Sequence, residues 1–192
     1  QEIFSLDEMI KIWDPARISK SPAIFDPLKL RAINAAYIRA LPAEEFRKLA
    51  DPFIDQAVHV QIDRDLLCAN LQPRCEVLED IPPQLDFFDA VLPIDAEMYR
   101  NKKQKTTPES AKEALSALLP VLEAQTDWSR DAIFEACKQK AEAMEKKNGW
   151  LLFPLGIALS GKARTPGGGT DLAAMMGKEE TLRRLNAAIE AL

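Results

Sequence analysis

The chain has 192 residues, of which 47% are hydrophobic and 29% are charged, as in an ordinary globular protein. A net charge of −5 argues against binding nucleic acid through overall charge, and no apolar run reaches the ~18 residues of a membrane span. Three cysteines and one histidine form no zinc pattern, so we expect reduced thiols in a cytoplasmic protein. Because the opening QEIFSLDEMI has no basic region and no apolar core, we expect no targeting segment there, and we expect the chain to be part of a longer one.

Helical spacing of apolar residues dominates the chain. The first clear helix follows Asp26 and Pro27, a good N-cap and first residue, and continues to Leu41. Capping residues and charged end turns predict further helices over 42–57, 107–125, 127–149 and 178–192. Only 57–63 alternates like a strand, and it is too short to build a sheet. The sequence therefore predicts an all-α fold.

Several large apolar residues occupy helical positions typical of a core. They are Trp13, Trp128, Trp150 and Phe153, and on one stripe of the last helix Leu182, Leu185, Ile189 and Leu192. Ile24 and Phe25, in the turn before Asp26, are also predicted to anchor in the core. Prolines punctuate the stretch EDIPPQLDFFDAVLPID. This punctuation predicts two small helical domains, over residues 1–85 and 86–192.

Two short motifs suggest nucleotide binding but lack the context for it. ISKS, with Lys20, resembles a phosphate-holding K-M-S-K-S loop, yet the chain has no H-x-G-H signature, and a turn leading to Asp26 explains it better. Gly156 to Lys162 spells G-x-x-x-x-G-K, but Ala163 stands where a hydroxyl would bind magnesium. A buried helix ending at Gly161 is the better prediction.

Two features leave alternatives open. The segment RTPGGGTDLAAMM either links two helices or offers a backbone that a partner approaches closely. Basic residues gather at 100–105 and again among Lys138, Lys140, Lys146, Lys147, Lys162 and Arg164, opposed in the second group only by Glu142 and Glu145. Each group is either a solvated surface or a contact for an anion.

Five stretches together resemble the C-terminal half of bacterial glutamyl-tRNA synthetases, a class I aminoacyl-tRNA synthetase family. They are FSLDEM, DPARISKSPAIFDPLKLRAINAAYIR, LQPRCEVLEDIP, KKNGWLLFPLGIALSGK and TPGGGTDLAAMMGKEETLRRL, in the family's order and spacing. The resemblance covers essentially the whole chain and implies a cage of helices that grips the tRNA anticodon. In that family SKSPAIFD lies downstream of the true ATP loop, so Lys20 is not expected to hold ATP.

The resemblance also implies what the chain lacks. The family's catalytic Rossmann domain, with its H-I-G-H signature and its site for ATP and Mg, is absent from these residues. We therefore expect tRNA binding without aminoacylation, and no cofactor or metal in this part. The expected partners are tRNA(Glu), with tRNA(Gln) left open, and the N-terminal catalytic domain of the same parent chain, but neither DNA nor a membrane.

Single positions carry over from the resemblance. Arg74 matches the arginine that contacts the third anticodon base in members that separate tRNA for glutamate from tRNA for glutamine. Thr165 and Pro166 match a Thr-Pro step that packs on anticodon bases. The other expected tRNA-binding residues are Lys102, Lys103, Lys105, Lys138, Lys162, Arg164 and Leu172. Gly156 stands where the family usually has an arginine.

Other interpretations remain at this stage. Arg74 could instead cap the preceding helix or pair with Glu76 or Glu79. The whole chain could be a helical scaffold that binds another protein, which its acidic charge and few aromatic residues would suit. A complete small nucleotide-dependent enzyme rests only on the two short motifs and is not favoured.

Overall fold

The computed structural model describes residues 3–18, 21 and 24–192, so Lys20 of the ISKS motif lies outside the described residues. Within those ranges the chain forms nine α-helices and five 3-10 helices and contains no β-strand, which confirms the all-α prediction. A single isolated bridge pairs Asn101 with Thr106. In the described part of the chain, no helix is both long and apolar enough to span a bilayer.

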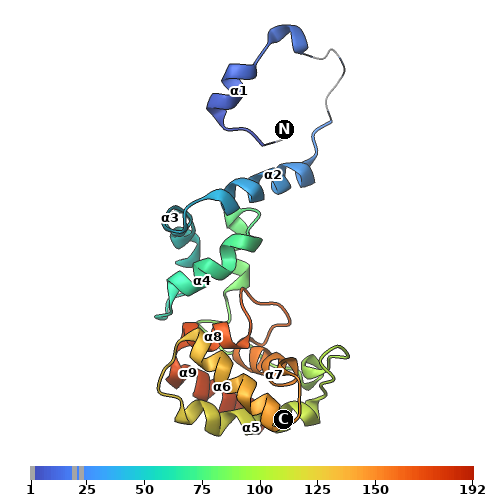
Figure 1. Cartoon of the computed structure of the whole chain (residues 1–192), viewed down its shortest axis with the longest axis vertical. Coiled ribbons are helices and arrows are strands. Elements are labelled where there is room, and N and C mark those ends of the chain that lie inside the picture. Colours follow the sequence, from blue (N-terminus) through green and yellow to red (C-terminus); the bar gives the residue numbers. More distant parts are fainter. Residues whose placement is uncertain (1–2, 19–20, 22–23) are drawn as a thin grey trace.

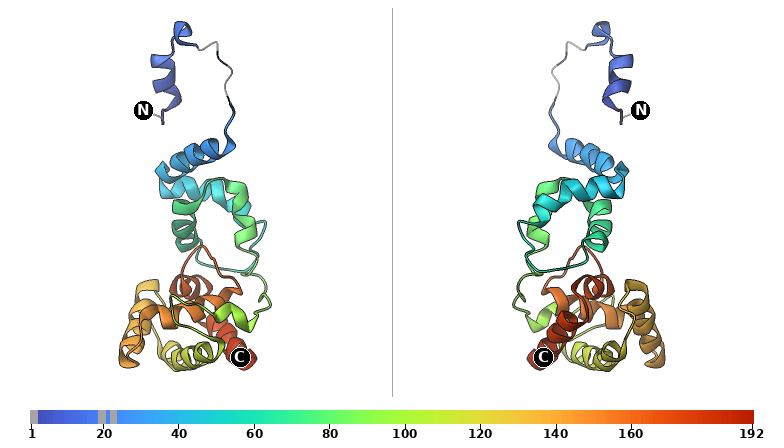
Figure 2. Two further views of the ribbon diagram at one scale, coloured as in Figure 1. Left: turned by 90° about the vertical axis from the view of Figure 1, so that its right-hand side faces the viewer. Right: turned by 90° about the vertical axis from the view of Figure 1, so that its left-hand side faces the viewer.

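The helices run along an elongated molecule (Figure 1). The α-helices are α1 (Leu6–Ile12), α2 (Pro27–Ala40), α3 (Ala43–Ile54), α4 (Arg64–Leu71), α5 (Pro108–Ala124), α6 (Arg130–Ala143), α7 (Asn148–Ser160), α8 (Gly169–Met176) and α9 (Lys178–Ala191). The 3-10 helices are η1 (Pro15–Arg17), η2 (Gln72–Arg74), η3 (Leu78–Asp80), η4 (Pro82–Gln84) and η5 (Ala96–Tyr99). Figure 2 shows α1 at one end, α3 and α4 in the middle and α5 to α9 at the other end.

Helix starts follow the predicted caps. Asp26 accepts hydrogen bonds from Leu28 N at 2.9 Å and Lys29 N at 3.1 Å, and Thr107 forms a capping box with Ser110. The helix predicted over 127–149 is wrong in its extent. Glu145 has a positive φ of 55°, which stops α6, and residues 148–149 already belong to the next helix.

The C-terminal helices pack around α7. This helix is apolar on nearly all sides and touches α5, α6, α8 and α9. It ends at Ser160, and Gly161 follows in the left-handed conformation with φ of 63°. The prediction of a buried helix ending at Gly161, rather than a phosphate loop, is confirmed.

The predicted core is only partly right. Trp150 and Leu185 are buried, Trp128 and Phe153 are half-buried, and α9 buries Thr181, Arg184, Leu185 and Ala188 more deeply than Leu182, Ile189 or Leu192. Trp13, Ile24 and Phe25 are 68%, 95% and 75% exposed, so their core prediction is wrong. Their segment extends beyond the helical body (Figure 1), where the described residues offer little to pack against.

The predicted boundary at 85/86 falls in the segment between η4 and η5. Buried residues on both sides of it belong to one hydrophobic cluster that includes Leu85 and Phe87. A backbone hydrogen bond from Asp63 N to Met175 O, 3.1 Å long, also joins the two parts. The division into 1–85 and 86–192 stays a prediction.

Candidate nucleic-acid interface

The backbone of Arg74 is fixed by the end of α2. Arg74 closes η2, which follows directly from α4. In the same turn, Gln72 Nε2 donates to Ile38 O at 3.0 Å and to Leu41 O at 2.8 Å. These carbonyls lie in the last turn and C-cap of α2, where helices leave acceptors unsatisfied. Arg74 therefore projects from a turn that is tied to two helices.

The segment after Arg74 is held to α2 as well. Arg31 forms ion pairs with Glu76, at 2.9 Å, and with Asp80, while Asn34 Nδ2 donates to Glu76 O at 2.6 Å. Glu76 is thus engaged by Arg31 and does not pair with Arg74 in this structure. The alternative in which Glu76 accounts for Arg74 is not supported.

Arg74 instead reaches the loop that follows α7. Its Nη1 donates to Thr165 O at 3.4 Å, across 91 residues of sequence. This bond is long for an N–H···O contact and therefore weak. A guanidinium has several N–H donors, and the side chain is exposed, so its other donors remain open to a ligand. Figure 1 shows this loop rising from α7 toward the segment after α4.

The loop has its own internal supports. Thr165 Oγ1 donates to Gly167 O at 2.6 Å, and Gly168 N donates to Asp171 Oδ2 at 2.7 Å. Arg130 Nε donates to the other Asp171 oxygen at 3.0 Å. Hydrogen bonds to Asp131 and Asp171 raise the pKa of Arg130. The loop is therefore held from α6 and α8 before any ligand arrives.

The glycines of PGGGT pack closely within the chain. A Cβ on Gly167 would lie 2.7 Å from Asp171 Cβ and 3.3 Å from Asn70 Oδ1 of α4. A Cβ on Gly169 would lie 2.8 Å from Leu152 O in α7. Of the two alternatives for this segment, the structure supports tight linkage of helices at these positions.

A groove of about 530 Å³ lies where η2 meets the loop. It is lined by Arg74, Gln84, Ala163, Arg164, Thr165 and Gly167. Two of these residues are arginines, and no lining residue in the described part of the chain is acidic. The acidic chain therefore concentrates positive charge at one hollow, which suits an anionic ligand with groups that accept hydrogen bonds.

The other predicted site residues near the loop have different environments. Pro166 is buried and Leu172 is 0% exposed, so in this structure they support the loop from beneath and present no surface to a base. Lys162 Nζ donates to Pro83 O at 2.9 Å, pairs with Asp86, and lies 6.0 Å from the Phe87 ring centroid. Lys162 therefore already holds the segment before η5.

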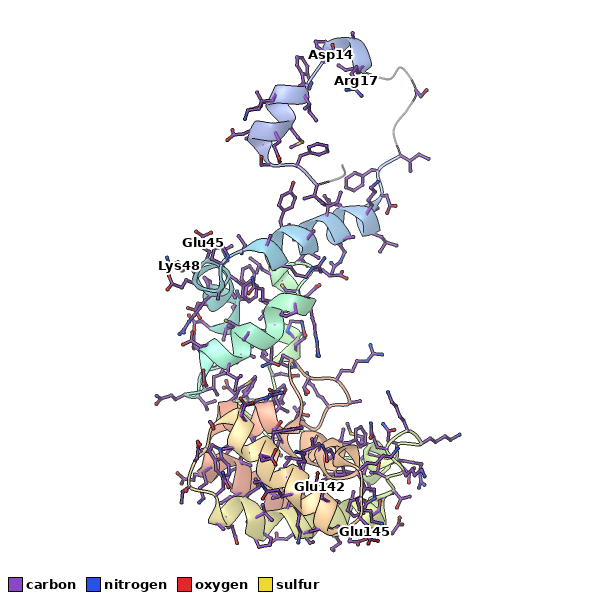
Figure 3. The ribbon with its side chains drawn as sticks, in the orientation of Figure 1. Asp14, Arg17, Glu45, Lys48, Glu142 and Glu145 are labelled. Carbon is purple, nitrogen blue, oxygen red and sulfur yellow. The ribbon has the colours of Figure 1, made fainter. Side chains whose placement is uncertain are left out.

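The remaining predicted basic residues lie outside the groove lining. Lys138 on α6 pairs with Glu135 at 3.3 Å. Lys102, Lys103 and Lys105 are exposed on the turn closed by the Asn101–Thr106 bridge. Figure 3 places Glu142 and Glu145 at the end of α6. These carboxylates moderate the positive charge of the second basic group.

Sequence reasoning missed the residues that position the site. They are Arg31, Asn34, Gln72 and Arg130. The sequence predicts Thr170 or Asp171 as the polar N-cap of the helix after the loop; that prediction is wrong, because the N-cap is Gly168 and Asp171 accepts a hydrogen bond from Gly168 N. For Gln72 and Asn34 the partners are backbone carbonyls far along the chain, which no local pattern reveals.

The structure is an all-α body in which a groove with two arginines lies between the turn at η2 and the glycine-rich loop. The sequence profile described as "Anticodon binding domain" matches residues 34–189, so the chain belongs to the anticodon-binding domain family. All the described site residues except Arg31 fall within the matched range.

The curated relatives specify which anticodon-binding proteins the chain resembles. It is 42% identical over 192 residues to glutamate–tRNA ligases of Clostridium botulinum and Clostridium acetobutylicum, and 41% identical to that of Clostridium tetani. Each match covers 100% of this chain but only 40%, 40% and 39% of the relatives. The chain thus matches the C-terminal, anticodon-binding part of these ligases.

Solved structures agree with the sequence comparisons. A glutamate tRNA ligase from Elizabethkingia meningosepticum, in complex with its amino acid, superposes with a TM-score of 0.82 at 27% identity. The glutamate-tRNA synthetase of Elizabethkingia anophelis gives 0.77 at 26% identity. The matches cover 100% and 99% of this chain and 38% and 37% of those chains.

Proposed function

We propose that this chain binds the anticodon arm of tRNA(Glu) at the groove between Arg74 and the Thr165 loop. The single observation that carries the proposal is the convergence of Arg74 and Arg164 on one groove that no described acidic residue lines. Phosphates attract such charge, and unpaired loop bases offer edges to a guanidinium.

Arg74 is the proposed reader of the third anticodon base. Glutamate anticodons end in C, whose O2 and N3 are neighbouring acceptors, whereas glutamine anticodons end in G, which presents N1–H and N2–H donors. Arginine only donates, so it satisfies C and leaves donors facing donors with G. An unpaired buried polar group costs roughly 1–3 kcal/mol, which supports discrimination of roughly 5-fold to 150-fold. Whether tRNA(Gln) is also bound depends on this contact.

The activity of the longer protein is a further proposal. The chain spans about 40% of the length of the ligases it matches. We propose that the remaining N-terminal part is a catalytic domain that joins glutamate to tRNA with ATP and Mg in the cytoplasm, and that this part binds RNA without catalysing the reaction. The proposed division into domains 1–85 and 86–192 places Arg74 in the first domain and Thr165 in the second.

The exposed apolar residues near the N-terminus fit such a parent protein. Leu6, Ile10, Trp13, Ile24, Phe25 and Leu28 are all largely exposed. A concentration of exposed large apolar side chains in one part of a chain is typical of a protein contact. We propose that the N-terminal catalytic domain covers this surface, which also accounts for the wrong core predictions there.

Direct binding tests the proposed function. The chain is titrated into fluorescently labelled tRNA(Glu), tRNA(Gln) and a duplex DNA of equal charge at low and moderate salt, and separately into ATP. We expect tRNA(Glu) to bind best and ATP not to bind. No affinity for either tRNA would instead favour the protein-binding scaffold, and equal affinity for the DNA would show charge-driven binding without recognition of tRNA.

A further inference from the structure

Arg184 is a buried arginine on α9 with an unusual set of partners. It is 2% exposed and, among the buried residues of the described chain, it alone is charged. Its Nε donates to Glu180 Oε1 at 2.5 Å, its Nη1 to Phe87 O at 2.6 Å and Leu159 O at 2.7 Å, and its Nη2 to Phe88 O at 2.9 Å. A buried charge is tolerated only when it is paired and hydrogen-bonded in this way.

The three carbonyls belong to two different segments. Leu159 lies in the last turn of α7, directly before the turn at Gly161 that begins the loop. Phe87 and Phe88 follow η4, whose Gln84 lines the groove beside Arg74. Arg184 therefore connects the end of α7, where the loop begins, to the segment that follows η4.

Lys162 makes a second connection between the same segments. From the loop, its Nζ reaches Pro83 O and Asp86. Ser160 Oγ donates to Gly156 O at 2.7 Å and accepts from Lys162 N at 3.1 Å, which orients the first residues after α7. The buried Arg184 and the partly buried Lys162 thus both connect the end of α7 to the segment around η4.

We propose that Arg184 is a positioning residue for anticodon reading: its guanidinium holds the carbonyl of Leu159 against those of Phe87 and Phe88, and so sets the Arg74–Thr165 separation. The proposal rests on the proposed function of the groove. A planar guanidinium can hold three carbonyls in fixed directions, whereas a lysine ammonium in the same place is a flexible point charge. Charge alone therefore cannot replace it.

Arg184→Lys tests this, with Arg183→Lys as the matched control. Arg183 is the neighbouring residue and pairs with the same Glu180 at 2.7 Å, but it is exposed and bonds to none of the three carbonyls. Hydrogen exchange of the 192-residue chain without RNA, and its affinities for tRNA(Glu) and tRNA(Gln), are measured for both variants.

We expect Arg184→Lys to speed exchange at least tenfold in residues 84–89 and 160–168 while α5 stays protected, and to reduce the affinity ratio of the two tRNAs at least threefold. Arg183→Lys should change neither. Unchanged local exchange, or a uniform increase through α5, would overturn the proposal, as would faster local exchange with an unaltered ratio.

A second variant keeps the proposal testable in case Arg184→Lys does not fold. If Arg184→Lys does not fold, Glu180→Gln is used, because it loosens the guanidinium by removing its anionic partner and keeps the arginine. The same two segments must then exchange faster, and their unchanged protection would refute the positioning role. If the unmodified chain binds both tRNAs equally, base reading by Arg74 fails, while hydrogen exchange alone still decides whether Arg184 positions the loop.

Discussion

Gly156 of α7 and Gly169 of α8 face each other, but only Gly169 requires the absence of a side chain. A Cβ on Gly169 would lie 2.9 Å from Gly156 N, which is closer than real contacts allow. A Cβ on Gly156 would lie 3.7 Å from Gly169 N, which is ordinary van der Waals contact. The crossing of α7 and α8, on which the loop between them depends, is therefore set by Gly169.

Gly169→Ala should destabilise the fold by about 1–3 kcal/mol, because the added methyl group pushes α8 from α7. Gly156→Ala is the matched control and should be neutral or stabilise by up to about 1 kcal/mol, since alanine favours a helix interior. Urea unfolding of both variants measures the difference. Equal effects would contradict the asymmetry between the two glycines.

Gly156→Arg should strengthen tRNA binding roughly tenfold, or about 1.4 kcal/mol. Gly156 lines a recess of about 170 Å³ together with Phe153 and Thr165, and Thr165 also lines the groove beside Arg74. An arginine there would add a guanidinium that can stack on a base and donate hydrogen bonds. The affinity for tRNA(Glu) is measured beside that of Gly156→Ala; a variant that folds but binds no better would show that the position faces no RNA.

Tyr99→Phe should leave stability at neutral pH unchanged or raise it by about 1 kcal/mol. The buried Tyr99 hydroxyl finds no hydrogen-bond partner among the described residues, so its removal relieves an unsatisfied group. A lower stability, measured by urea unfolding at pH 7, would show that a hydrogen bond is lost.

Tyr99→Phe should also change how the stability of the fold depends on pH in alkaline solution. Burial raises the pKa of Tyr99 from 10.0 to about 12, so above pH ~10 the unfolded chain loses a proton that the folded chain keeps. This contribution to stability is fully present below pH ~10 and is lost as the pH rises through about 12. Stability should fall less steeply from pH ~10 to ~12 in Tyr99→Phe. The raised pKa values of Cys68, Cys75 and Cys137 act in both proteins and cancel in the comparison.

The helical framework was predictable because its signals are local. Asp26, Thr107 and Gly161 each mark a helix end through contacts within a few residues, and the structure confirms all three. The end of α6 was missed because a left-handed Glu145, unlike a glycine, carries no compositional signal.

The site was predictable only in part. The Thr-Pro-Gly segment and Arg74 stand out through family resemblance, but their meeting depends on a contact across 91 residues. Arg184 was not predicted to be buried, because the buried face of α9 was inferred from its leucines alone. That face also includes this arginine, whose partners are backbone carbonyls far away in the sequence. Trp13, Ile24 and Phe25 were placed in a core because an apolar residue looks the same whether it packs within the chain or beneath another domain.

Replacing Lys102, Lys103 and Lys105 by alanine should weaken all tRNAs alike. Phosphate contacts carry no base information, so the ratio between tRNA(Glu) and tRNA(Gln) should not change. If about three phosphates are neutralised, the slope of log K against log salt is near −2 in the parent chain, and it should become shallower in the variant. Lys48→Ala on α3, labelled in Figure 3, serves as the control for a lysine on another helix. An unaltered slope in the triple variant would show that this turn does not contact the RNA phosphates.

The most direct measurement compares the affinities of the chain for tRNA(Glu) and tRNA(Gln) before and after Arg74→Gln. Glutamine both donates and accepts, so the variant should lose affinity for tRNA(Glu), retain it for tRNA(Gln), and narrow the ratio by about tenfold. Arg164→Gln, in the same groove, should weaken both tRNAs equally. An equal loss for both tRNAs with Arg74→Gln, or no loss for either, would contradict the account that Arg74 reads the third base.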